Sequence, residues 1–197
     1  MFSRYFSEES IWSLELDEAG RAKGQAVRAF DSTKREQCPA FSPDGTRVVL
    51  ESDRSGTDEI WICPTTGQGC RQLTKFGGPH VGSPSWSPDG EWIAFDGSGE
   101  TGSVIYKIRS DGGEPLRVAD GWVPRWSRDG RWIYYAKSTP AQGVSAQLYR
   151  IPPEGGQPVL VGGTAGGTVA EESPDRSWVY YSLQASELST KLRRTGT

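Results

Sequence analysis

The chain has 197 residues, of which 22 are basic and 25 acidic, and its formal net charge is −3. A chain of this length can bury a core as one domain. Its interspersed charges give no electrostatic case for binding nucleic acid or an anionic membrane through this segment. These residues contain no signal-peptide pattern and no transmembrane run.

The N-terminal part carries the first predicted strands, at 11–16 and 25–30. Ser3 stands at the same distance from Ile11-Trp12 as Ser52 does from Ile60-Trp61. This spacing indicates that the chain opens near the end of a strand that would be second in its structural repeat.

A turn sequence then recurs along the chain. Ser42-Pro43-Asp44-Gly45 returns three times, and the serines of the four copies lie 45, 40 and 46 residues apart. Pro suits position i+1 of a type I turn, Asp suits i+2, and Gly supplies the left-handed residue that closes a hairpin. The last copy has Arg176 in place of Gly, at a cost of about 1 kcal/mol for a non-Gly residue at positive φ. The predicted turn residues are Asp44, Gly45, Asp89, Gly90, Asp129, Gly130 and Asp175.

Each turn lies between apolar segments rich in β-branched and aromatic residues, which predict strands. A Pro-x-aromatic step precedes the turn, and a Gly turn follows the third strand and leads to a fourth. We find no convincing 3.6-residue apolar period and expect essentially no helix. The predicted second strands are 47–50, 91–95, 131–135 and 177–181, and the predicted third strands are 59–62, 104–108, 147–151 and 188–193.

Four short antiparallel strands in a repeat of this length are typical of a β-propeller blade, so the chain is predicted to be a single all-β domain over residues 1–197. Two arrangements fit. Either this is part of a longer propeller, which the opening in mid-blade favours, or the strands at 11–16 and 25–30 complete the last blade of a four-blade ring. In the first arrangement, exposed blade edges would promote self-association. The predicted blades are 37–80, 82–121 and 122–164, flanked by partial blades at 1–36 and 168–197.

Three cysteines are present. Cys63 and Cys70 flank a turn between two strands of one hairpin, so a cross-strand disulfide is geometrically possible. Without evidence of an oxidising compartment, two reduced thiols are the favoured interpretation. Cys38, just before an inner strand, is predicted to be a small core residue.

The sequence indicates no catalytic centre, no metal site and no cofactor. Any Ser-His-Asp triad would have to use His80, the only histidine. Asp53, Asp58 and Glu59 lack the ligand spacing of a calcium loop and are interpreted as a solvated turn. In propellers the connectors between blades and the loops between second and third strands share one face. The predicted contact residues on that face are Phe76, His80, Trp122, Asp53, Arg54 and Lys137.

The recurring Pro-x-Trp-Ser-Pro-Asp-Gly string, the segment 53–61 and Gln72-Leu73-Thr74 resemble the TolB-type, WD-repeat-like β-propeller family over about residues 3–193. Segments 76–80 and 127–134 look particularly like propellers that follow a winged-helix or Ser/Thr kinase domain in large bacterial proteins. The resemblance implies a module that mostly binds partners, and a periplasmic location if the chain is TolB-like; the sequence leaves the compartment open. Related propellers also gate oligopeptidases, and fold alone does not choose between such functions.

The leading functional hypothesis is a non-catalytic module that binds another protein, or another domain of its own polypeptide, through its loop face. The alternative is the regulatory portion of a larger kinase, winged-helix regulator or peptidase whose active domain lies upstream. Catalysis within the propeller itself is the least favoured hypothesis.

Overall fold

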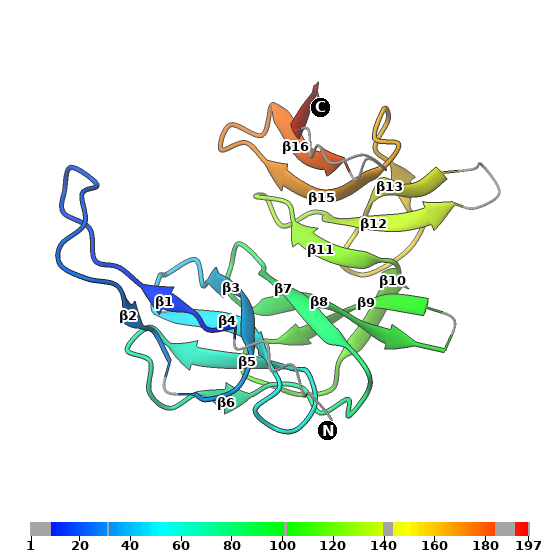
Figure 1. Ribbon diagram of the computed structural model, residues 1–197. Coiled ribbons are helices and arrows are strands. Elements are labelled where there is room, and N and C mark those ends of the chain that lie inside the picture. The colour runs from blue at the N-terminus through cyan, green and yellow to red at the C-terminus, as the bar shows by residue number, and fades with distance from the viewer. Residues whose placement is uncertain (1–8, 31, 101, 140–143, 184–191, 197) are drawn as a thin grey trace, which may run out of the picture.

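The computed structural model describes residues 9–30, 32–100, 102–139, 144–183 and 192–196, and it shows a curved array of small β-sheets (Figure 1). Every regular element in those residues is a strand, as the strand-rich repeat predicted. The described part of the chain contains no helix that could cross a membrane.

Three sheets have four antiparallel strands each, paired in chain order. The first contains β3 (Glu36–Phe41), β4 (Arg47–Ser52), β5 (Glu59–Pro64) and β6 (Arg71–Gln72). The second contains β7 (Val81–Trp86), β8 (Trp92–Gly99), β9 (Gly102–Arg109) and β10 (Leu116–Asp120). The third contains β11 (Trp122–Trp126), β12 (Ile133–Thr139), β13 (Val144–Ile151) and β14 (Val159–Leu160).

Two smaller sheets stand at the ends of the array. One contains β15 (Gly167–Glu172), β16 (Trp178–Leu183) and β17 (Leu192–Gly196), and the other contains β1 (Trp12–Ser13) and β2 (Val27–Arg28). The predicted strand at 188–193 is therefore found from Leu192 onward, and residues 188–191 lie outside the described part of the chain.

The β1–β2 hairpin lies at the opposite end of the array from β15 and β16 (Figure 1). Ile11, Ala29 and Phe30 next to it pack against Val48 and Leu50 of β4. In this structure the N-terminal strands therefore cover the first four-stranded sheet and are not paired with the last sheet.

The recurring turn is built from side-chain hydrogen bonds. The Asp44 Oδ1 atom accepts hydrogen bonds from the Ser42 hydroxyl (2.6 Å) and the Thr46 backbone N–H (3.0 Å), and Gly45 has φ of 68°. In the last copy Arg176 takes the position of Gly with φ of 58°, and its guanidinium contacts Asp129 in the preceding copy. The residue that departs from the repeat thus adopts the glycine conformation.

The core lies between neighbouring sheets. Apolar residues of β4 and β5 pack against those of β7, β8 and β9, and equivalent layers lie between the second and third sheets and between the third sheet and β15–β16. A blade has two apolar faces, so stacking is what buries both of them.

Two predictions about cysteine are wrong. Cys63 and Cys70 form a disulfide. The β5–β6 register pairs Trp61 with Gln72, which places the two cysteines directly opposite each other. Cys38 is exposed, not in the core, because a break in the β3–β4 register next to it places it at a positive φ of 51°.

Candidate functional site

The innermost strands of the three four-stranded sheets share an irregularity. Cys38, Ser83 and Val123 occupy equivalent positions, and all three have positive φ where the pairing register shifts. Non-glycine residues adopt this conformation only where the surroundings enforce it. At Val123 the backbone N–H donates a hydrogen bond to Asp96 Oδ2 (3.1 Å) in the preceding sheet. The irregular backbone at Val123 therefore donates a hydrogen bond to a buried carboxylate, Asp96, between two blades.

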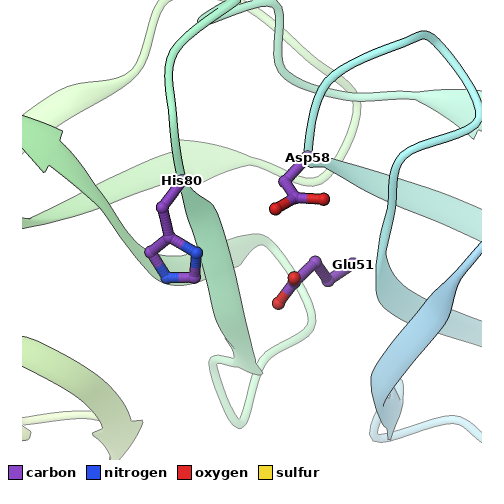
Figure 2. A group of neighbouring side chains, drawn as sticks. All are labelled: Glu51, Asp58 and His80. Atoms are coloured by element: carbon purple, nitrogen blue, oxygen red, sulfur yellow. The ribbon is translucent and has the colours of Figure 1, made fainter. Parts of the chain in front are cut away.

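A group of acidic residues and the sole histidine gathers beside this region. Glu51 lies on β4, Asp58 lies in the loop before β5, and His80 lies in the connector that enters β7 (Figure 2). One ligand atom from each of these three side chains lies within 4.8 Å of the others. The Asp96 Oδ1 atom, from β8, lies 3.9 Å from His80 Nε2. We call Glu51, Asp58, His80 and Asp96 the carboxylate–histidine cluster.

The repeat explains how the cluster forms. Glu51 and Asp96 each follow the serine of the preceding turn by nine residues, so they occupy equivalent places in successive blades. The stacking of the blades brings these places close together. Arg35 and His80 likewise occupy equivalent places in the connectors that enter β3 and β7.

Burial dominates the electrostatics of the cluster. Glu51 is 5 % exposed and Asp96 is 3 % exposed, and loss of hydration raises the pKa of both carboxyl groups. The negative charge of Asp58 raises the pKa of Glu51 further. Within the described part of the chain, the buried Asp96 Oδ1 atom has no hydrogen-bond partner. The cluster thus holds carboxylates whose charges are only partly compensated.

Arg35 and a glycine shape the edge of the cluster. The Arg35 guanidinium forms an ion pair with Asp58 and lies 3.5 Å from Glu51, while its backbone N–H donates to Asp53 Oδ1 (2.9 Å). A Cβ at Gly82 would overlap Glu51 Oε2 and lie 2.9 Å from His80 Cε1. The absence of a side chain at Gly82 is therefore what admits both groups.

The structure brings together only part of the predicted contact set. His80 lies in the cluster, and Asp53 adjoins it through Arg35. Trp122 is half-buried and packs against the core between the third sheet and β15–β16, next to the Val123 N–H that binds Asp96.

The other predicted contact residues have different surroundings. Phe76 packs edge-on against Phe95 and Tyr106 in the core between the first two sheets. Arg54 forms an ion pair with the buried Glu36 and lies over the Trp61 ring. Lys137 lies on β12 in register with Gln147.

Sequence reasoning missed Glu51, Asp58 and Asp96 as neighbours of His80. The interpretation of Asp53, Asp58 and Glu59 as a solvated turn is wrong for Glu59, which is 1 % exposed and accepts hydrogen bonds from Thr74 Oγ1 (2.6 Å) and the Gly77 N–H (2.8 Å). One pattern in the sequence could have indicated the cluster: Glu51 and Asp96 are carboxylates at the same place in two successive repeats. A polar residue in an otherwise apolar second strand needs a partner.

A separate concave surface lies along the inner strands β3, β7 and β11, with a volume of about 560 Å³. It is formed by the repeated Pro-x-aromatic steps, with Trp86, Trp126 and Arg125 among its lining residues. Aromatic residues and Arg are common at the centres of protein interfaces.

Known proteins share this sequence pattern and fold. A family model described as the TolB beta propeller domain matches residues 20–122. An uncharacterized peptidase, YuxL of Bacillus subtilis, is 35 % identical over 114 residues, which are 55 % of this chain and 16 % of that protein. A TolB homolog of Chlorobium chlorochromatii is 33 % identical over 84 residues, which are 36 % of this chain and 19 % of that protein.

The similarity to solved structures is one of fold. The crystal structure of TolB from Acinetobacter baumannii matches 92 % of this chain and 45 % of that chain, with a TM-score of 0.73 and 22 % identity. The present chain spans less than a fifth of the length of each of these two relatives.

Proposed function

Because the chain belongs to the TolB β-propeller family, we propose that it is a non-catalytic binding module that recognises a protein segment through its loop face. By loop face we mean the β4–β5 loop and the connectors entering β3, β7 and β11. The partner is another protein or another domain of the same polypeptide.

The observation that carries this proposal is the convergence of separate connectors on one charged area. The connector entering β3 contributes Arg35, the β4–β5 loop contributes Asp58, and the connector entering β7 contributes His80, whose side chain is 45 % exposed. Such connectors bear function in folds with a rigid scaffold, because they tolerate sequence change while the strands hold their ends. Mixed charge with exposed polar atoms suits a specific and reversible protein contact.

The test is capture of a partner on the immobilised protein, followed by substitution. We expect His80→Ala and Trp122→Ala each to reduce recovery of the partner, while Asp111→Ala, an exposed change in the β9–β10 turn, leaves recovery unchanged. Unchanged recovery with both loop-face variants would contradict the assignment of the face.

A second function is favoured by the peptidase relative. Its 35 % identity extends over half of this chain, and the matched segment is a small part of a longer protein. In this alternative the propeller regulates access to a peptidase domain in the same polypeptide. Mass analysis of the native gene product and a peptidase assay on it distinguish the two functions. Peptide hydrolysis by the native product, absent from the 197-residue chain alone, would support the alternative.

A further inference from the structure

We propose that Glu51, Asp58 and His80 bind one divalent transition-metal ion, Zn²⁺ or Mn²⁺, with Asp96 orienting the histidine. This inference does not depend on the protein-binding function. It concerns a site between two blades, whichever partner the loop face has.

The donor atoms lie near the separation at which they could share one ion. Carboxylate oxygen and imidazole nitrogen bind Zn²⁺ at about 2.0–2.2 Å, so two ligands of one ion can be at most about 4.4 Å apart. The ligand atoms of Glu51, Asp58 and His80 already lie within 4.8 Å of one another. Small side-chain rotations would close the site, and the half-exposed His80 ring provides a route of entry from solvent.

The orientation of His80 matches that of a metal ligand. One ring nitrogen faces the carboxylates of Glu51 and Asp58 (Figure 2), while Nε2 lies 3.9 Å from Asp96 Oδ1. Histidines that bind metals commonly donate their second ring N–H to a carboxylate, which sets the tautomer and the ring orientation. Asp96 therefore acts as a positioning residue.

Asp96 supplies an independent indication of a ligand. Its side chain is almost completely buried, Oδ2 accepts the Val123 N–H, and Oδ1 has no hydrogen-bond partner among the residues that the structure describes. A buried carboxylate oxygen without a partner is costly. A His80 ring that binds the metal through its other nitrogen has this N–H available for the Asp96 oxygen, which lies 3.9 Å from Nε2 in the structure.

The charges also suit a divalent ion. With Glu51, Asp58 and Asp96 ionised and Arg35 protonated, three negative charges face one positive charge and leave an excess of two. The Arg35 guanidinium donates a hydrogen bond to Asp58 Oδ1, which leaves Asp58 Oδ2 for a metal ion.

The mixed donor set selects the kind of metal. Ca²⁺ prefers six to eight oxygen ligands, and Mg²⁺ prefers oxygen ligands and retains water. Imidazole suits Zn²⁺, while carboxylates suit Mn²⁺ and also bind Zn²⁺. We therefore expect both ions to bind more tightly than Ca²⁺ or Mg²⁺.

The first experiment uses the metal-free protein and MnCl₂, with free Mn²⁺ measured by electron paramagnetic resonance. We expect one ion per chain and an affinity that falls at least tenfold in His80→Gln and in Asp58→Asn. Asp120→Asn is the matched control, because Asp120 occupies the place of His80 in the next blade and pairs with the exposed Arg117. Stoichiometric binding lost in both ligand variants and retained in the control supports the site. Absence of binding, or binding equal in His80→Gln, overturns it.

The second experiment needs no ligand substitution. His80 is the only histidine of the chain, so its imidazole signals in nuclear magnetic resonance are unambiguous. Addition of ZnCl₂ should shift these signals until one equivalent is present, and an unchanged His80 spectrum would contradict the proposal. Asp96→Asn should keep the stoichiometry but lower the affinity and alter the tautomer ratio of His80. An unchanged ratio would refute the positioning role.

Gly82→Ala provides a variant that removes no donor. The added Cβ would overlap Glu51 Oε2 and crowd His80, and its backbone conformation is not one that requires glycine. We expect affinity for Mn²⁺ to fall by about tenfold, within the range seen when groups that orient ligands are changed. Full affinity in a folded Gly82→Ala protein would show that the ion binds elsewhere.

Discussion

Removal of the Tyr135 hydroxyl should stabilise the protein. Tyr135 lies on β12, is fully buried and packs beside Tyr149 with ring centroids 6.0 Å apart. In the residues described by the structure, its hydroxyl oxygen has no hydrogen-bond partner. The equivalent residue of the preceding blade is Phe95, which shows that this position accepts a ring without a hydroxyl.

The magnitude follows from the cost of burial. A hydroxyl buried without a hydrogen bond costs about 1–3 kcal/mol in proteins. Tyr135→Phe removes that cost but leaves a small void, which offsets part of the gain. We expect a net increase of about 1–2 kcal/mol in the free energy of unfolding. For a chain of this size each 1 kcal/mol raises Tm by about 2–4 °C.

Tyr134→Phe is the matched control on the neighbouring residue. Tyr134 is also buried, but its hydroxyl donates a 2.8 Å hydrogen bond to Glu172 Oε1. Loss of a hydrogen bond to a charged acceptor costs about 1.5–3 kcal/mol. The same chemical change at adjacent positions should therefore shift stability in opposite directions.

The assay is urea unfolding followed by tryptophan fluorescence, with thermal unfolding by circular dichroism as a second measurement. The slope against urea should stay constant in both variants, so that a change of midpoint reports a change of stability. A lower midpoint for Tyr135→Phe would mean that the hydroxyl is paired in solution, and the argument from its missing partner would then be wrong.

Three further predictions concern the disulfide, a turn aspartate and the irregular last repeat. Reduction of the Cys63–Cys70 disulfide should lower the free energy of unfolding by about 2–3 kcal/mol, the chain-entropy value for so short a loop. Alkylation under denaturing conditions should modify one cysteine before reduction and three after it. Modification of three cysteines before reduction would contradict the pairing. Hydrogen bonds from the Ser42 hydroxyl and, to a lesser extent, the Thr46 backbone N–H lower the pKa of Asp44 to about 2. The stabilising contribution of the Asp44 carboxylate should therefore be complete above about pH 4 and disappear as pH falls through about 2. A carbon-13 titration midpoint near the ordinary pKa of about 3.9 would contradict this. Arg176→Gly should relieve about 1 kcal/mol of backbone strain and lose an exposed ion pair worth less, so a fall in Tm would show that the ion pair dominates.

Local chemistry made the strands and turns predictable. Turn residues such as Asp44 and Gly45 act within a few positions of themselves, and a period-two apolar segment such as 91–95 indicates a strand wherever it lies. Arg176 illustrates this well, because its departure from the repeat predicted the strained conformation that the structure contains. The propeller fold followed from the repetition of these signals, and the resemblance of the recurring motifs pointed to the TolB-type family.

The contact set was harder to predict, because exposure depends on neighbours that are distant in the sequence. Arg54 and Phe76 lie in loops, yet an ion pair with Glu36 and packing against Phe95 draw them into the structure. Cysteine is commonly a buried residue, but the break in strand register beside Cys38 places this cysteine at the surface.

The sequence by itself determined the repeat and the all-β architecture, because these depend on hydrogen bonds and side-chain alternation over short stretches of chain. The resemblance of its recurring motifs indicated the family, which the family model confirms. Only the tertiary structure decided the pairing of Cys63 with Cys70 and the meeting of Glu51, Asp58 and His80. Register between strands and stacking between blades bring together residues that no local pattern connects. The chemistry of the site is therefore a property of the contact between blades, while the fold is already present in each repeat.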